Sequence, residues 1–185
     1  NTIQDLINQG QIVAGHDIGS GGLITTLLEL TFADINLAAN YDLSGLGEED
    51  TVKALFNENI GLVLQAKENT TFEAILASAG VHAIKIGEAV AGNEVTIKNN
   101  VDIFTFNVNE TRDTWFKTSF LLDQKQSKNG MAEARFNNYK NQPLVFNFPT
   151  QFTGKKPINT GNRPKAAIIR EKGSNSEREM ANAMF

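Results

Sequence analysis

Apolar residues recur at helical spacing twice near the start of the chain. In residues 2–10 they fall at Ile3, Leu6 and Ile7 and end before Gly10, which predicts a short amphipathic helix. After Ser20 they repeat at i, i+3, i+4 and i+7 through residues 23–30, which predicts a buried helix. Residues 11–18 form a short apolar run between the two. The pattern therefore places a glycine-rich turn, residues 19–22, at the N-terminus of a buried helix.

Residues 35–108 alternate between strand-like and helix-like patterns. We expect strands over 35–43, 60–67, 81–90, 92–99 and 101–108, and helices over 48–59 and 70–80. The first of these helices has acidic residues in its first turn, and Thr70 or Thr71 is expected to cap the second. Gly92-Asn93 is a turn dipeptide, so a hairpin is predicted between 81–90 and 92–99. Residues 1–140 are therefore predicted to form an α+β domain, a mixed β-sheet with helices packed on it.

The pattern changes after residue 108. One helix is indicated by a stripe of residues at helical spacing, which are Trp115, Ser119 and Leu122 together with Phe116 and Phe120. A second, shorter helix is indicated by residues 131–139. Residues 141–164 contain all four prolines, which predicts an extended linker, and their apolar side chains predict that it packs against a surface.

The last 21 residues begin with a strand pattern at 166–169 and continue, after a polar turn at Gly173, into an amphipathic helix. One strand and one helix cannot bury their own faces. Residues 165–185 are therefore expected to be the opening βα unit of a further, truncated domain.

Charge and composition narrow the class of protein. The 185 residues include no cysteine, which excludes disulfides, thiolate metal sites and cysteine nucleophiles from this chain. No apolar run is long enough to span a bilayer and the start does not resemble a signal peptide, so we expect a cytoplasmic protein without membrane contact. Residues 1–154 carry 18 acidic against 10 basic side chains, and residues 155–185 carry 3 against 7. The basic end lacks interleaved aromatic residues, which argues against nucleic-acid binding.

His16 and Asp17 stand directly before the glycine-rich turn. The N-terminus of a helix attracts anions, and a carboxylate beside phosphate groups is how proteins commonly hold magnesium. The pattern thus favours an anion or a metal, with the N–H groups of residues 19–22 free to meet an anion. Two structural alternatives remain open: Asp17 caps the turn through backbone N–H groups, and His16 is a hydrogen-bonded structural residue.

Two motifs carry a family resemblance. The stretch "HDIGSGGLITTLLELTFA" resembles the His-Asp-x-Ser-x-Gly-Gly-Leu motif in the second synthetase half of the phosphoribosylformylglycinamidine synthase family, within the aminoimidazole ribonucleotide synthetase superfamily. The stretch "AAIIREKGSNSEREMANAMF" resembles the first strand and helix of the class I glutaminase domain that follows that half. Two stretches between these motifs, "LFNENIGLVLQ" and "TRDTWFKTSFLLDQ", also resemble the spacing found in that family. The resemblance covers nearly the whole chain.

The resemblance implies a fold and a function. Residues 1–140 would be a synthetase C-terminal-type domain, residues 141–164 a linker, and residues 165–185 the start of a glutaminase domain. The whole enzyme would be a ligase of purine biosynthesis that uses ATP, magnesium and ammonia from glutamine. The partners of this chain would be the remaining domains of the same polypeptide and a nucleotide.

The resemblance also implies roles for individual residues. Asp17 would bind Mg²⁺, and the turn would contact ATP or ADP through Gly19, Ser20, Gly21 and Gly22. The family usually has Ser where this chain has Gly19, so that hydroxyl contact is lost here, and Ser20 or a backbone N–H would replace it. No catalytic residue is expected in this chain, because the chemistry of the family lies mainly in other segments. The alternatives are a docking module with a vestigial nucleotide site, and another kinase or ligase of the superfamily.

Overall fold

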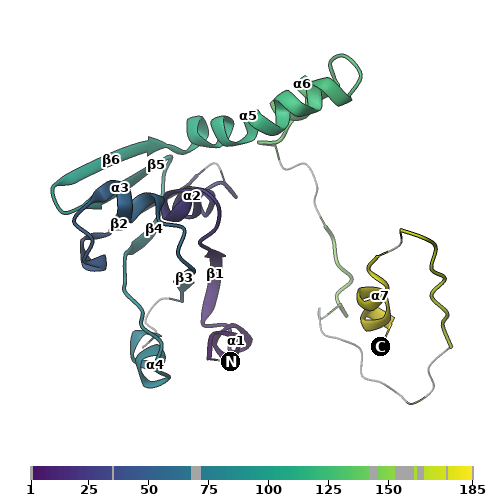
Figure 1. Ribbon diagram of the computed structural model, residues 1–185, viewed down its shortest axis with the longest axis horizontal. Coiled ribbons are helices and arrows are strands. Elements are labelled where there is room, and N and C mark those ends of the chain that lie inside the picture. Colours follow the sequence, from purple (N-terminus) through teal and green to yellow (C-terminus); the bar gives the residue numbers. More distant parts are fainter. Residues whose placement is uncertain are drawn as a thin grey trace. The chain divides into compact units, whose positions relative to one another are not determined.

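The computed structural model describes residues 2–34, 36–67, 72–141, 146–152, 161, 165–173 and 175–184 (Figure 1). The chain divides into two compact units, residues 1–142 and residues 143–185. No helix in the described ranges is long and apolar enough to cross a bilayer. The predicted cap at Thr70 or Thr71 lies outside those ranges, as do the linker residues 142–145 and 153–160.

The first unit begins with elements that place the glycine-rich turn. In chain order they are α1 (Thr2–Asn8), β1 (Ile12–Asp17), α2 (Gly22–Glu29), β2 (Leu37–Asp42), a 3-10 turn (Ser44–Leu46), α3 (Thr51–Phe56), β3 (Leu62–Ala66) and α4 (Phe72–Ser78). They are followed by β4 (Gly87–Ala91), β5 (Glu94–Asn99), β6 (Asp102–Asn107), α5 (Val108–Gln126) and α6 (Met131–Asn138). The predicted helices and strands are therefore found at nearly the predicted places, although β4 covers only the second half of residues 81–90.

The strands of the described residues form two sheets. β1 and β3 pair antiparallel, and a four-stranded sheet has the order β4-β2-β5-β6. In the larger sheet β2 and β5 are parallel, whereas β4 and β6 are antiparallel to their neighbours. The prediction of an α+β fold with a mixed sheet is confirmed.

The predicted hairpin across Gly92 and Asn93 is wrong. β2 lies between β4 and β5, and the Gly92 N–H donates to the carbonyl of Asn36 just before β2 begins. The short connection therefore passes around the end of β2 instead of joining adjacent strands. The hairpin occurs one strand later, between β5 and β6, where Asn100 adopts a φ of +52°. Asparagine tolerates this left-handed conformation, which the sequence analysis did not anticipate at this position.

The core lies between the four-stranded sheet and the helices α2 and α3. Leu27 of α2, Leu55 of α3, and Val95 and Ile97 of β5 are 0–5% exposed and belong to one buried cluster. Asp50 caps α3 by accepting hydrogen bonds from the N–H groups of Val52 and Lys53. The acidic residues expected in the first turn of this helix therefore stand just outside it: Asp50 is its N-cap, and Glu48 and Glu49 precede the cap. A negative charge near the N-terminus of a helix is favourable.

The helices α5 and α6 pack through only part of the predicted stripe. Phe116 and Phe120 are half-buried against α6, with Phe116 stacked on Tyr139 at a centroid distance of 4.4 Å. Trp115 and Leu122, however, are 53% and 57% exposed. The buried face of α5 begins instead at Val108 and includes Arg112. The Arg112 Nη1 donates to the carbonyl of Phe32 at 3.1 Å. A pattern of apolar residues does not identify such a buried arginine as part of the core.

Within the second unit, Phe146, Phe148 and Phe152 stack in series, with centroid distances of 6.4 and 4.8 Å. The helix expected near the end of the chain is α7 (Glu177–Met184). Residues 166–169, expected to be a strand, belong to no strand among the described residues. A strand is defined by hydrogen bonds to a neighbour, and the described residues of this unit form no strand with which it could pair.

Candidate functional site

The glycine-rich turn joins the end of β1 to the start of α2. Gly21 and Gly22 both have positive φ, +91° and +77°, which favours glycine. A Cβ on Gly22 would lie 2.6 Å from the backbone carbon of Phe56 at the end of α3. Gly22 is therefore required both for the turn and for the close approach of α2 to α3.

Asp17 presents an exposed carboxylate from a well-held main chain. Its side chain is 79% exposed. Its carbonyl oxygen accepts hydrogen bonds from Thr26 Oγ1 at 3.0 Å and from His16 Nδ1 at 2.6 Å. The next amide, Ile18 N–H, donates to the Gly61 carbonyl at 2.9 Å. The peptide group between Asp17 and Ile18 is thus held on both sides, which directs the carboxylate to solvent at the start of the turn.

Both ring nitrogens of His16 are engaged. Nδ1 contacts the Asp17 carbonyl and lies 3.5 Å from the Asp17 Oδ1, while Nε2 lies 3.0 Å from Glu29 Oε2. The other Glu29 oxygen, Oε1, accepts a hydrogen bond from Trp115 Nε1 at 2.6 Å. This geometry matches the structural alternative for His16. Sequence reasoning did not identify Glu29, because its partners lie 13 positions before it and 86 positions after it.

The N–H groups of the turn are less available than expected. Gly21 N–H donates to Glu58 Oε1 at 2.8 Å, and Gly22 N–H donates to the Gly19 carbonyl at 3.1 Å. For Gly19 and Ser20 no backbone acceptor is found among the described residues. The expectation of free N–H groups is therefore wrong for the two glycines that start the helix, and it stays a prediction for Gly19 and Ser20. Glu58 belongs to the "LFNEN" stretch, whose charge gave no sign of this contact.

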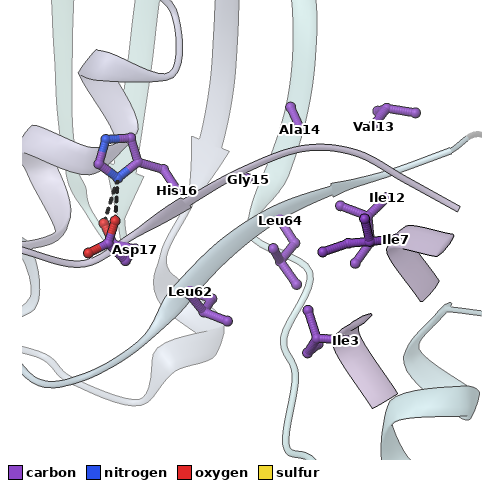
Figure 2. A pocket seen from close by; sticks show the side chains of 10 residues that line it. All are labelled: Ile3, Ile7, Ile12, Val13, Ala14, Gly15, His16, Asp17, Leu62 and Leu64. Atoms are coloured by element: carbon purple, nitrogen blue, oxygen red, sulfur yellow. Dashed lines mark hydrogen bonds and ion pairs between the residues drawn. The ribbon is translucent and has the colours of Figure 1, made fainter. Parts of the chain in front are cut away.

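An open hollow borders the same strand (Figure 2). Ile3 and Ile7 of α1 and Leu62 and Leu64 of β3 line it, and His16 and Asp17 lie at its other end in Figure 2. The lining is apolar apart from that end. The hollow therefore suits an apolar contact and offers a ligand only the polar groups beside the turn.

The residues present allow a partial magnesium site. No group of three or more His, Cys, Asp or Glu side chains that could hold a metal occurs in the ranges that the structure describes. Asp17 is a single, accessible carboxylate. Mg²⁺ usually keeps several waters and binds proteins through one or two carboxylates together with phosphate oxygens. Asp17 thus fits the role of one ligand in a set completed by phosphates, water and other segments.

Comparisons with known proteins identify the family of the chain. Residues 1–99 match the family described as AIR synthase related protein, C-terminal domain. Over 97% of its length the chain is 32% identical to the human phosphoribosylformylglycinamidine synthase. Over 99% it is 34% identical to the Arabidopsis thaliana protein named probable phosphoribosylformylglycinamidine synthase, chloroplastic/mitochondrial. The chain spans only 14% and 13% of the length of these two relatives.

Solved structures show the same fold. The structure of T. maritima PurL complexed with ATP superposes with a TM-score of 0.50 and 16% identity, over 58% of this chain and 20% of that one. The structure of PurLQS from Thermotoga maritima gives a TM-score of 0.50 and 18% identity over the same shares. At these identities the likeness concerns the arrangement of helices and strands.

Proposed function

Since residues 1–99 place the chain in the family described as AIR synthase related protein, C-terminal domain, we propose that it is a segment of a phosphoribosylformylglycinamidine synthase. The similarity to two enzymes of that name over nearly the whole chain carries this proposal. The same resemblance was inferred from the His16-Asp17 motif and the last twenty residues, and the comparisons confirm it. The small share of each relative that the chain spans supports further domains in the same polypeptide.

The complete enzyme would convert formylglycinamide ribonucleotide, ATP and glutamine into formylglycinamidine ribonucleotide, ADP, phosphate and glutamate. Phosphoryl transfer activates the amide oxygen, and ammonia released from glutamine then displaces it. We assign residues 1–140 to the synthetase C-terminal domain, 141–164 to the linker and 165–185 to the start of the glutaminase domain. A cytoplasmic location stays a prediction, because the name of the Arabidopsis relative gives an organelle for that protein.

Within this enzyme, residues 17–22 would contribute to a Mg-nucleotide site. Asp17 would bind Mg²⁺, which neutralises charge on the nucleotide phosphates. Gly19 and Ser20 would donate their N–H groups to phosphate oxygens, and Gly21 and Gly22 would let the backbone approach closely. Three observations support these roles: the exposed carboxylate, the held peptide group behind it, and the amides of Gly19 and Ser20, for which the described residues supply no backbone acceptor. An ATP complex of a structural neighbour supports a nucleotide as the ligand.

The chain by itself would be inactive. A class I glutaminase attacks glutamine with a cysteine thiolate, and this chain has no cysteine. Incubating the purified chain with glutamine should therefore release no glutamate. Release that persists through further purification and follows the chain would overturn the assignment.

The nucleotide role can be tested by titrating the 15N-labelled chain with Mg-ADP in NMR. We expect weak binding, with amide shifts concentrated at residues 17–22, and loss of these shifts in Asp17→Asn. Glu88→Gln, an exposed carboxylate on β4, is the matched control for lost charge. Shifts that are spread elsewhere, or that survive in Asp17→Asn, would show that the nucleotide does not use this turn.

One observation favours a second candidate, a docking module with a vestigial nucleotide site. The Gly21 N–H, which a phosphate would be expected to use, is bonded to the chain's own Glu58. In that case neither Mg-ADP nor inorganic phosphate would shift the amides of residues 17–22 at any accessible concentration.

A further inference from the structure

Glu29 joins three elements at the turn. It lies at the end of α2, with its side chain 22% exposed. Its Oε1 accepts a hydrogen bond from Trp115 Nε1 of α5 at 2.6 Å, and its Oε2 lies 3.0 Å from His16 Nε2 of β1. A hydrogen bond to a carboxylate is shorter and stronger than one between neutral groups, so the Trp115 indole is held firmly while the second carboxylate oxygen contacts the His16 ring.

The contact continues from His16 to the main chain that carries the candidate magnesium ligand. Nδ1 of the same imidazole lies 2.6 Å from the Asp17 carbonyl (Figure 2). That carbonyl belongs to the peptide group whose N–H, at Ile18, donates to Gly61. A ring held at Nε2 cannot swing away from this carbonyl at Nδ1. The orientation of the Asp17–Ile18 peptide therefore depends on a carboxylate twelve residues downstream of Asp17.

We propose that Glu29 is a positioning residue for the Asp17 turn, acting through the His16 ring, with Trp115 of α5 as its second support. This role rests on the proposed nucleotide function of the turn. Among the described residues, Glu29 makes no hydrogen bond or ion pair with the Asp17 side chain or the glycine amides. It would therefore act on the geometry of the turn and not on the ligand directly. It also ties the orientation of the turn to α5.

Comparison with a neighbouring carboxylate, Glu110, shows that the contacts of Glu29 are specific to it. It borders a hollow between α2 and α5 together with Thr25, Phe32, Glu110 and Trp115. Glu110 is an exposed carboxylate at the border of the same hollow, and no side-chain hydrogen bond of Glu110 is recorded among the described residues. Two carboxylates thus share one hollow, and only one of them holds an indole and an imidazole. Glu110 therefore provides a control with the same charge in the same place.

The ligand-independent test is amide hydrogen exchange of the full chain, comparing Glu29→Gln with Glu110→Gln. Glutamine keeps the shape of Glu29 but removes its charge and replaces one carboxylate oxygen by an NH2 group, so it cannot reproduce both contacts of the carboxylate. We expect the Ile18 amide to exchange about fivefold faster or more in Glu29→Gln, with the core amides of Val95 and Ile97 unchanged. Trp115→Phe, which removes one donor and keeps a ring beside Phe32, should have a smaller effect in the same direction. Equal Ile18 exchange in all variants would overturn the proposal.

The second arm is Mg-ADP titration of the same variants. We expect the affinity for Mg-ADP to be about threefold to tenfold lower in Glu29→Gln and unchanged in Glu110→Gln. The indole N–H resonance of Trp115, the only tryptophan in the sequence, should shift as the wild-type chain is saturated. Wild type that does not bind would refute the proposed function, and Ile18 exchange would then decide the positioning role alone. Binding by wild type and by Glu29→Gln with equal affinity would overturn the positioning role while leaving the nucleotide site intact.

Discussion

Glu58 and Gly21 are joined by a hydrogen bond of 2.8 Å from the Gly21 backbone N–H to the Glu58 Oε1, although they lie 37 positions apart. The acceptor is a carboxylate at the N-terminus of a helix, where a negative charge is favoured. The chain thus supplies its own anion at a position where the proposed function needs a phosphate. A phosphate that used the Gly21 N–H would have to displace Glu58.

Glu58→Gln should therefore bind phosphate more tightly than wild type. The amide is a weaker acceptor than the carboxylate and carries no charge to repel the ligand. We expect Mg-ADP affinity to rise about threefold to fivefold, measured by the amide shifts of Gly19 and Ser20. Glu88→Gln again serves as the control for charge. A lower affinity in Glu58→Gln would mean that Glu58 holds the turn open for the ligand instead of competing with it.

Gly22→Ala should destabilise the first unit strongly. Alanine at a φ of +77° costs about 1–2 kcal/mol, and the Cβ would also meet the Phe56 backbone at 2.6 Å. We expect a loss of about 3 kcal/mol or more in urea denaturation. Gly19→Ala is the matched variant, because a Cβ there has nothing within 4 Å. Similar losses for both substitutions would contradict the close approach of α2 to α3.

Gly19→Ser restores the hydroxyl that the related family usually has at this position. The open space around Gly19 predicts little change in stability. If the turn binds phosphate, the added hydroxyl should raise Mg-ADP affinity by about fivefold, the value of one hydrogen bond. Gly19→Ala, which fills the same space without a donor, should not. An affinity that does not differ between the serine and alanine variants would place the phosphate away from residue 19.

The chain has two tyrosines, and both should ionise at unusually high pH. Burial raises the pKa of Tyr41 to about 12. Burial and the hydrogen bond to Asp113 raise the pKa of Tyr139 to about 12. Because the unfolded pKa is about 10, this stabilisation is complete below pH 10 and is lost as the pH rises towards 12.

Absorbance titration of the phenols checks this prediction. The native chain should show no phenolate near pH 10, whereas the chain in urea should be about half ionised there. Tyr41→Phe leaves Tyr139 as the single titrating phenol and separates the two. A native midpoint near pH 10 in that variant would contradict the burial of Tyr139 against α5.

The elements that could be predicted are those with strong local periodicity. The helix after Ser20 was predictable because Leu23 and Leu27 repeat along one face and both are buried. Strand order was not predictable, because Gly92-Asn93 specifies a tight connection but not the strand it passes around. The buried face of α5 was missed in part, because Arg112 is 5% exposed through contacts with Phe32 and Asn109 that periodicity does not register.

In the candidate site, too, the contiguous residues could be predicted and the residues brought in by the fold could not. Residues 16–22 are contiguous, so a motif could identify them. Glu29 and Glu58 reach the turn only through the fold, one from the far end of α2 and the other from beyond α3. Single glutamates are common in the outer turns of helices and in loops, and nothing in the sequence context of Glu29 and Glu58 separates them from Glu88 or Glu110.

The central place of β2 also determines when the larger sheet can assemble during synthesis. Leu37 pairs with Ala91 and Ala39 pairs with Val95, so both edges of β2 wait for residues more than fifty positions downstream. At about 5–20 residues per second, the ribosome takes roughly 3–11 seconds to supply them. During that interval β2 has two unpaired edges carrying the apolar segment around Ala38 and Ala39. A nascent chain stalled before residue 91 should therefore bind a chaperone that recognises extended segments, and should release it once β5 has emerged.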